Sequence, residues 1–236
     1  MRHAGSGGSI VPAQMFEPRF IKAVLSTGLP FGVAMGLFFW AQAIEKKTIA
    51  ALSALAIRRG WRFVPKSEER PTCFGRDIEL FQRGRNQRTS YRIDFQAGGR
   101  HVEAFQFSYV SGHGKNKDTK SQTIIAVTNS KAQLPKFSLS PENVFHKIAN
   151  VFGYRDINFE QDEEFSKKFR LNGNNETLIR KLFNAEVIGA AKSRGELNIQ
   201  ADGDTLVFFT ERKVISPDQI EAAIEDRIAL SQLFFS

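Results

Sequence analysis

The sequence predicts an α+β protein in which one N-terminal transmembrane helix is followed by antiparallel β-meander units with helices packed on them. Three observations predict this class: a long uncharged apolar run near the N-terminus, strands of alternating polarity joined by glycine turns, and helical patterns after those strands. The 236 residues can bury a core, and 42% hydrophobic with 25% charged residues excludes disordered and fibrous classes.

The apolar run occupies residues 23–44, where 22 consecutive residues carry no charge. As a helix it would be roughly 33 Å long at about 1.5 Å per residue, which matches a hydrocarbon core of about 30 Å. Small residues at every fourth position predict a helix face that another membrane helix can approach closely. These residues are Gly28, Gly32 and Gly36. Residues 1–22 are expected to form a flexible tail.

Basic residues are denser after the apolar run than before it, beginning with Lys46 and Lys47. The positive-inside rule therefore predicts a single-pass protein of the inner or plasma membrane with a cytoplasmic C-terminal domain. The single cysteine, Cys73, agrees with a reducing compartment. The alternative is a signal peptide cleaved after Ala43, which would leave a secreted soluble domain, but the run is longer than a typical signal-peptide core.

The net charge differs between the segments of the chain. The net charge is +8 overall, but residues 1–44 carry +2, residues 45–136 carry +10 and residues 137–236 carry −4. We therefore expect a basic α+β half over 45–153 and an acidic α+β half over 154–236. The basic half would face anionic lipid if it lies next to a membrane.

The basic half begins with apolar residues at helical spacing, which predict a helix over 46–59 that Gly60 ends. Further on, Tyr91, Ile93 and Phe95 alternate with polar residues and predict a half-buried strand. The expected elements are strands over 61–64, 91–96, 101–110 and 123–128, with a turn at Gly98-Gly99, and a helix from Ser140 and Pro141 to Phe152.

The acidic half shows shorter strand patterns and strong turn and cap signals. Its expected elements are strands over 156–159 and 165–171, a turn at Asn172-Gly173, a helical region over 176–192, a hairpin of 197–200 and 205–209 around Asp202-Gly203, and a last helix opened by Ser216 and Pro217.

Four groups of residues in the domain carry a recognisable pattern. They are Gly60-Trp61-Arg62-Phe63, Ser111-Gly112-His113-Gly114-Lys115-Asn116, the set Asp156, Phe159 and Glu160, and Glu164-Phe165-Ser166-Lys167-Lys168-Phe169. These motifs resemble an uncharacterised bacterial family of single-span membrane-anchored proteins with a cytoplasmic domain of unknown function. The resemblance covers about residues 55–233 and implies the anchor and the α+β class. Because that family has no established activity, it implies no catalytic residue.

Glycines and lysines are concentrated between the strands expected over 101–110 and 123–128, and a cluster of arginines precedes the strand expected over 91–96. Backbone N–H groups and basic side chains in such a loop predict contact with an anion or lipid headgroup, whereas a plain hairpin loop needs no ligand. The candidate residues are Gly112, Gly114, Lys115 and Lys117 in the loop, with Arg83, Arg85 and Arg88. Since Asn116 stands where a P-loop needs serine or threonine, a nucleotide-binding P-loop is excluded.

No catalytic constellation, metal spacing or cofactor fingerprint is present in the sequence. We therefore expect a non-enzymatic interaction or scaffold subunit, without cofactors, that binds a protein partner or the inner leaflet. The competing class is a membrane-tethered nucleic-acid-binding module, because arginines lie near aromatic residues of the expected strands. Strand alternation argues against that interpretation, because it places Tyr91 and Arg92 on opposite faces, Tyr91 on a core face and Arg92 on a solvent-exposed face.

Overall fold

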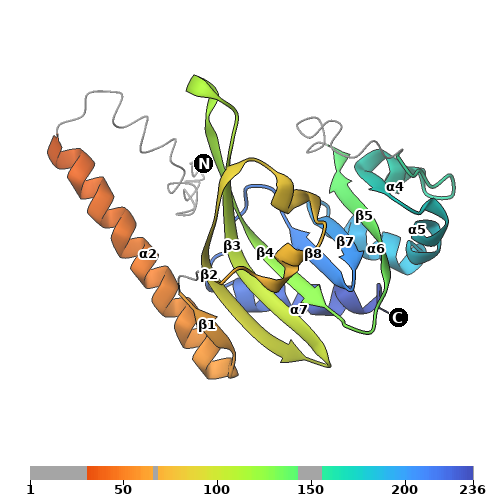
Figure 1. The fold of residues 1–236 in the computed structure, drawn as a ribbon, viewed down its shortest axis with the longest axis horizontal. Helices are drawn as coiled ribbons and strands as arrows, with labels where there is room; N and C mark the ends of the chain where they lie inside the picture. Colours follow the sequence, from red (N-terminus) through yellow and green to blue (C-terminus); the bar gives the residue numbers. More distant parts are fainter. Residues whose placement is uncertain (1–30, 66–68, 143–155, 236) are drawn as a thin grey trace, which may run out of the picture.

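The computed structural model describes residues 31–65, 69–142 and 156–235. At its centre lies one antiparallel sheet of eight strands in the order β1-β2-β3-β4-β8-β7-β5-β6 (Figure 1). The strands are β1 (Arg62–Val64), β2 (Arg85–Ala97), β3 (Arg100–Ser111), β4 (Asp118–Thr128), β5 (Leu134–Pro141), β6 (Phe169–Gly173), β7 (Asn198–Gly203) and β8 (Thr205–Phe209).

Helices pack around this sheet. Within the described ranges the α-helices are α2 (Phe31–Arg59), α4 (Glu163–Lys168), α5 (Glu176–Leu182), α6 (Ala185–Ser193) and α7 (Ile220–Gln232). Short 3₁₀ turns are η2 (Thr72–Gly75), η3 (Glu79–Gln82) and η4 (Gly114–Asn116). The C-terminal end of α2 and the helix α7 share one core with the sheet, through Leu52, Leu55, Ile220 and Ile224.

The expected fold class is wrong in its first element. Among the described residues, no helix is long and apolar enough to cross a membrane, so neither a transmembrane helix nor a single-pass topology is retained. The described part of 23–44 belongs to α2, which continues through Glu45, Lys46 and Lys47 as one helix and packs its C-terminal end on the sheet. Residues 1–22 and 23–30, including Gly28, lie outside the described residues.

The rest of the expected class is also corrected. Instead of successive meander units, the described residues form mainly one eight-stranded antiparallel sheet with few helices. The β2-β3-β4 meander and the hairpin β7-β8 are confirmed, and Gly98, Gly99 and Gly203 have the positive φ that their turns require. The order of the strands in the sheet differs from their order in the sequence, because the β7-β8 hairpin lies between β4 and β5. The pairing of β8 with β4 places both halves of the chain in one sheet.

Two local expectations differ from the structure. Ser140 and Pro141 are the last residues of β5, and Glu142 directly after them is helical. Residues 165–171 divide into α4 and β6 instead of forming one strand, because Asp162 accepts a hydrogen bond from the Phe165 N–H and starts α4. The part of the expected helix over 143–152 lies outside the described residues.

Both faces of the sheet are buried, each against a different cover. Alternation along β3 places Val102 and Ala104 in the core under the helices, and Phe105 and Phe107 in a second core on the opposite face. The second core is covered by residues 71–83, named here the strap, which contains η2 and η3. The strap contributes Cys73, Phe74, Ile78, Leu80 and Phe81 to it.

A buried carboxylate fastens the strap to the sheet. The Glu103 side chain projects from β3 toward the start of η2 and is 1% exposed. Its oxygens accept hydrogen bonds from the Thr72 N–H at 2.9 Å, the Thr72 hydroxyl at 2.6 Å and the Cys73 N–H at 3.2 Å. The Arg92 guanidinium lies 3.9 Å away. Glu103 thus satisfies amide groups that a short helical turn leaves without intrahelical partners.

We expect Glu103→Gln to lower the free energy of unfolding by about 1.5–3 kcal/mol, because the amide nitrogen cannot accept the bonds that the charged carboxylate accepts. Urea unfolding followed by circular dichroism measures this change. The matched control is Glu163→Gln, since Glu163 forms a solvent-exposed pair with Lys167 and its loss should change stability by about 0.5 kcal/mol or less. Equal effects of the two substitutions would contradict the role of Glu103.

Candidate functional site

The N-terminal part of α2 carries large apolar side chains that the described chain leaves uncovered. Figure 1 shows α2 beside β1 at its C-terminal end, with its N-terminal part projecting past the sheet. Five exposed residues, named here the apolar end of α2, are Val33, Met35, Phe38, Phe39 and Trp40. Phe38 and Phe39 are 55% and 61% exposed. Contiguous exposed aromatic residues of this kind are typical of a binding surface.

Basic residues gather at the same end of the molecule. Lys46 and Lys47 are exposed on α2 and have no ion-pair partner among the residues that the structure describes. The pairing of Val64 with Arg92 means that β1 runs toward the N-terminal end of β2. Arg85 and Arg88 therefore lie at the end toward which the apolar end of α2 projects.

The predicted anion loop forms the tip of the β3-β4 hairpin at that end too. Arg85 pairs with Val110 and Arg88 with Ser108, so both arginines lie on β2 beside the hairpin. Lys115 and Lys117 are exposed at the tip, next to Gly114. Gly112 has a φ of +72°, and a Cβ there would overlap the Asn116 carbonyl oxygen, so the hairpin geometry itself requires this glycine.

Arg83 occupies a different environment from the other predicted arginines. Its side chain is 10% exposed and pairs with Glu79 at 2.7 Å and with Glu211. Burial disfavours its charge, but the two carboxylates outweigh burial and raise the pKa of Arg83. Arg83 thus fastens the C-terminal end of the strap to the segment after β8, and its charge is not available to an external anion.

The predicted helix-contact glycines are only partly described. Gly32 and Gly36 both lie in α2. A Cβ added at Gly36 would meet nothing within 4 Å, so no part of the described chain packs against this position.

The aromatic residues that suggested nucleic-acid binding lie inside the protein. Phe105, Phe107 and Tyr109 share one face of β3, as alternation predicts, but the strap covers that face. Burial raises the pKa of Tyr109 to about 12. Arg92, expected on a solvent-exposed face, is also buried beside Glu103. These rings therefore present no face on which bases could stack.

The environment of Cys73 disfavours a reactive thiolate. Burial, and next the negative charge of Glu103, raise the pKa of the Cys73 thiol well above its ordinary value, which disfavours the nucleophilic thiolate. Within the described ranges, no three His, Cys, Asp or Glu side chains are grouped to hold a metal ion.

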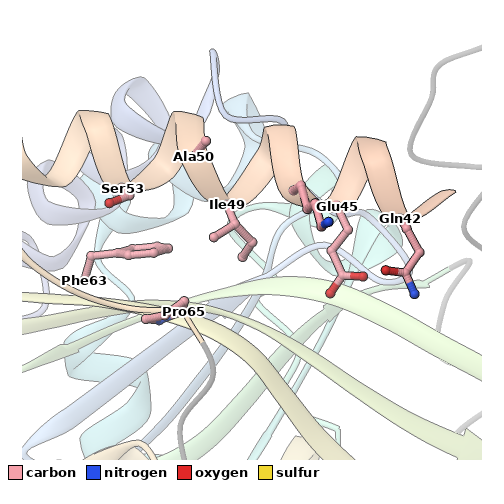
Figure 2. Close-up of a pocket in the computed structure, with 8 residues that line it drawn as sticks. Gln42, Glu45, Ile49, Ala50, Ser53, Phe63 and Pro65 are labelled. Carbon is pink, nitrogen blue, oxygen red and sulfur yellow. The ribbon is translucent and has the colours of Figure 1, made fainter. Parts of the chain in front are cut away.

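A groove runs between α2 and the end of β1. Its volume is about 650 Å³, and the residues that line it are Gln42, Glu45, Lys46, Ile49, Ala50, Ser53, Phe63 and Pro65. Figure 2 shows Ile49 directed from α2 toward the strand, with Phe63 and Pro65 beneath the helix and Glu45 and Gln42 farther along it.

Comparison with known proteins yields a structural match alone. No family model matches the sequence, and no curated protein matches it. A solved structure, the crystal structure of the mycobacterial trehalose monomycolate transport factor A, TtfA, matches with a TM-score of 0.56. The chain shares the fold of TtfA. The sequences are 9% identical, and the match covers 79% of this chain and 95% of the TtfA chain. The resemblance to an uncharacterised bacterial family stays a prediction.

Sequence reasoning missed the residues that hold the strap and the residues of the groove. Glu103 had a visible signal, because it interrupts the apolar positions of β3 on the face that Phe105 and Phe107 share. A lone carboxylate on a buried strand face predicts a paired or hydrogen-bonded group. The groove had no such signal: its walls, residues 42–53 and 63–65, are close in the sequence, but the side of α2 that faces the strand is set by tertiary packing.

We expect Arg83→Met to lower the free energy of unfolding by about 3–5 kcal/mol, because it leaves Glu79 and Glu211 half-buried without their counter-charge. Arg88→Met is the matched control: Arg88 is exposed, and the change should stay within about 0.5 kcal/mol. Chemical denaturation measures both. A small effect at Arg83 would return this residue to the candidate anion contacts.

Proposed function

We propose that this chain is a non-enzymatic accessory factor that docks on the anionic surface of a membrane through the apolar end of α2. The observation that carries this proposal is the set of exposed aromatic side chains on that helix, with Phe38, Phe39 and Trp40 in succession. Phenylalanine and tryptophan side chains enter the boundary between headgroups and acyl chains of a bilayer.

Charge supports lipid as the occupant of this surface. Lys47 on α2, Arg85 and Arg88 on β2, and Lys115 and Lys117 at the hairpin tip lie at the end from which the aromatic residues project. Each basic residue near an anionic leaflet contributes about 1 kcal/mol before screening. A protein partner with an apolar groove would use the aromatic residues but would not require this basic surround.

The fold comparison supports an accessory role by analogy. TtfA is described as a transport factor, and this chain shares its fold. Because one fold can serve many functions, the analogy suggests an accessory role in transport and assigns no cargo.

We expect the full chain to float with vesicles that contain phosphatidylglycerol and to remain unbound with vesicles of phosphatidylcholine alone. The double substitution Phe38→Glu and Phe39→Glu should weaken binding at least about tenfold, because two aromatic side chains lose their burial in lipid. Circular dichroism should stay unchanged, since both side chains are exposed.

The matched control is Ile57→Glu, which places the same charge on an apolar residue of α2 that is 78% exposed and lies at the opposite end of the helix. It should float like the unmodified chain. Substitution of Lys47 and Arg88 by Gln should reduce binding and its dependence on salt. Vesicle binding that survives Phe38→Glu/Phe39→Glu, or that is lost equally with Ile57→Glu, would overturn the proposal.

A further inference from the structure

The groove between α2 and β1 lies outside the surface proposed to dock on the membrane. Its volume of about 650 Å³ falls in the range of small-molecule sites, about 300–1,000 Å³. The apolar side chains of Ile49, Ala50, Phe63 and Pro65 form much of its wall. Ile49 and Phe63 also contact the main core, so the helix and the strand hold these walls in fixed positions.

The charged side chains lie at one end of the groove, whereas the other end is lined by apolar residues and the hydroxyl-bearing Ser53. Glu45 and Lys46 carry opposite charges at the charged end, beside Gln42, and neither charge has an ion-pair partner among the residues that the structure describes. Figure 2 shows the Glu45 and Gln42 side chains extending from α2 on the side of Phe63 and Pro65, beyond Ile49. The groove is therefore apolar along one part and carries a positive and a negative group at the other.

This distribution of groups matches an amphiphile with a zwitterionic head. We propose that the groove holds one acyl chain of an ethanolamine phospholipid, with the ammonium group at Glu45 and the phosphate at Lys46. An anionic lipid would satisfy Lys46 and leave Glu45 facing a like charge, and a neutral sterol would satisfy neither. Charge complementarity thus selects a zwitterionic head, and the primary ammonium of ethanolamine, unlike choline, can also donate hydrogen bonds to the Glu45 carboxylate.

The position of the groove connects it to the docking surface. Gln42 and Glu45 come directly after the apolar end of α2, so a lipid can pass along the helix from a docked bilayer into the groove. Delivery of the lipid from a bilayer rests on the proposed function, because it requires membrane docking. Binding of a soluble lysolipid in the groove is independent of docking and can be measured without a membrane.

The test uses the full chain and lysophosphatidylethanolamine, with lysophosphatidylglycerol for comparison, in native mass spectrometry and equilibrium dialysis. We expect one lysophosphatidylethanolamine per chain and weaker binding of lysophosphatidylglycerol. Ala50→Trp should weaken binding at least tenfold, because the indole fills the groove from an exposed position on α2. Its matched control is Ala51→Trp, which adds the same side chain to an exposed neighbour that does not line the groove.

Substitution of the residue proposed to bind the lipid head group gives a second test. Glu45→Gln should remove the preference for the ethanolamine lipid while leaving acyl-chain binding. Equal binding by the Ala50→Trp and Ala51→Trp variants, or equal affinity of the unmodified chain for both lysolipids, would overturn the proposal. A chain that fails to float on vesicles but binds the lysolipid would contradict membrane docking alone. A chain that floats, with Ala50→Trp binding the lysolipid normally, would contradict the groove alone.

Discussion

The hydrogen bonds of the Glu103 carboxylate are the constraint on which the second face of the sheet depends. A sheet with apolar side chains on both faces needs a cover on each, and the strap that covers one face contains only short 3₁₀ turns. Such short turns form few backbone hydrogen bonds of their own. Glu103 supplies the missing acceptors at the start of the strap, and the pairs of Arg83 supply a second attachment at its end.

Because both faces of the sheet are covered, the exposed aromatic side chains of the described residues are found on α2. The C-terminal end of this helix belongs to the core through Leu52 and Leu55, while the N-terminal part exposes aromatic side chains. A rigid attachment at one end fixes the direction in which the other end projects. The proposed docking surface and the proposed lipid groove therefore lie along one helix, whose position the core determines.

Local patterns in the sequence were sufficient to predict the β2-β3-β4 meander, the β7-β8 hairpin and the end of α2 at Gly60, because alternation and glycine turns act over a few residues. They could not predict the pairing of β4 with β8, which joins residues about eighty positions apart, or the strap, whose residues show no regular period. The hydropathy of 23–44 suggested a membrane span, but hydropathy does not register that the same helix continues into a globular core. Of the candidate anion residues, Arg85, Arg88, Lys115 and Lys117 are brought to one end, whereas Arg83 pairs inside the protein.

The place of β8 beside β4 also determines how the chain must be made. During synthesis, β4 leaves the ribosome long before Thr205–Phe209, its partner on that side, has been translated. Until then the nascent chain carries a long, apolar edge strand with unpaired backbone groups, which is a template for pairing with other chains. Completion of the sheet is therefore late and non-local, and we expect the growing polypeptide to depend on protection by chaperones until its last strands emerge.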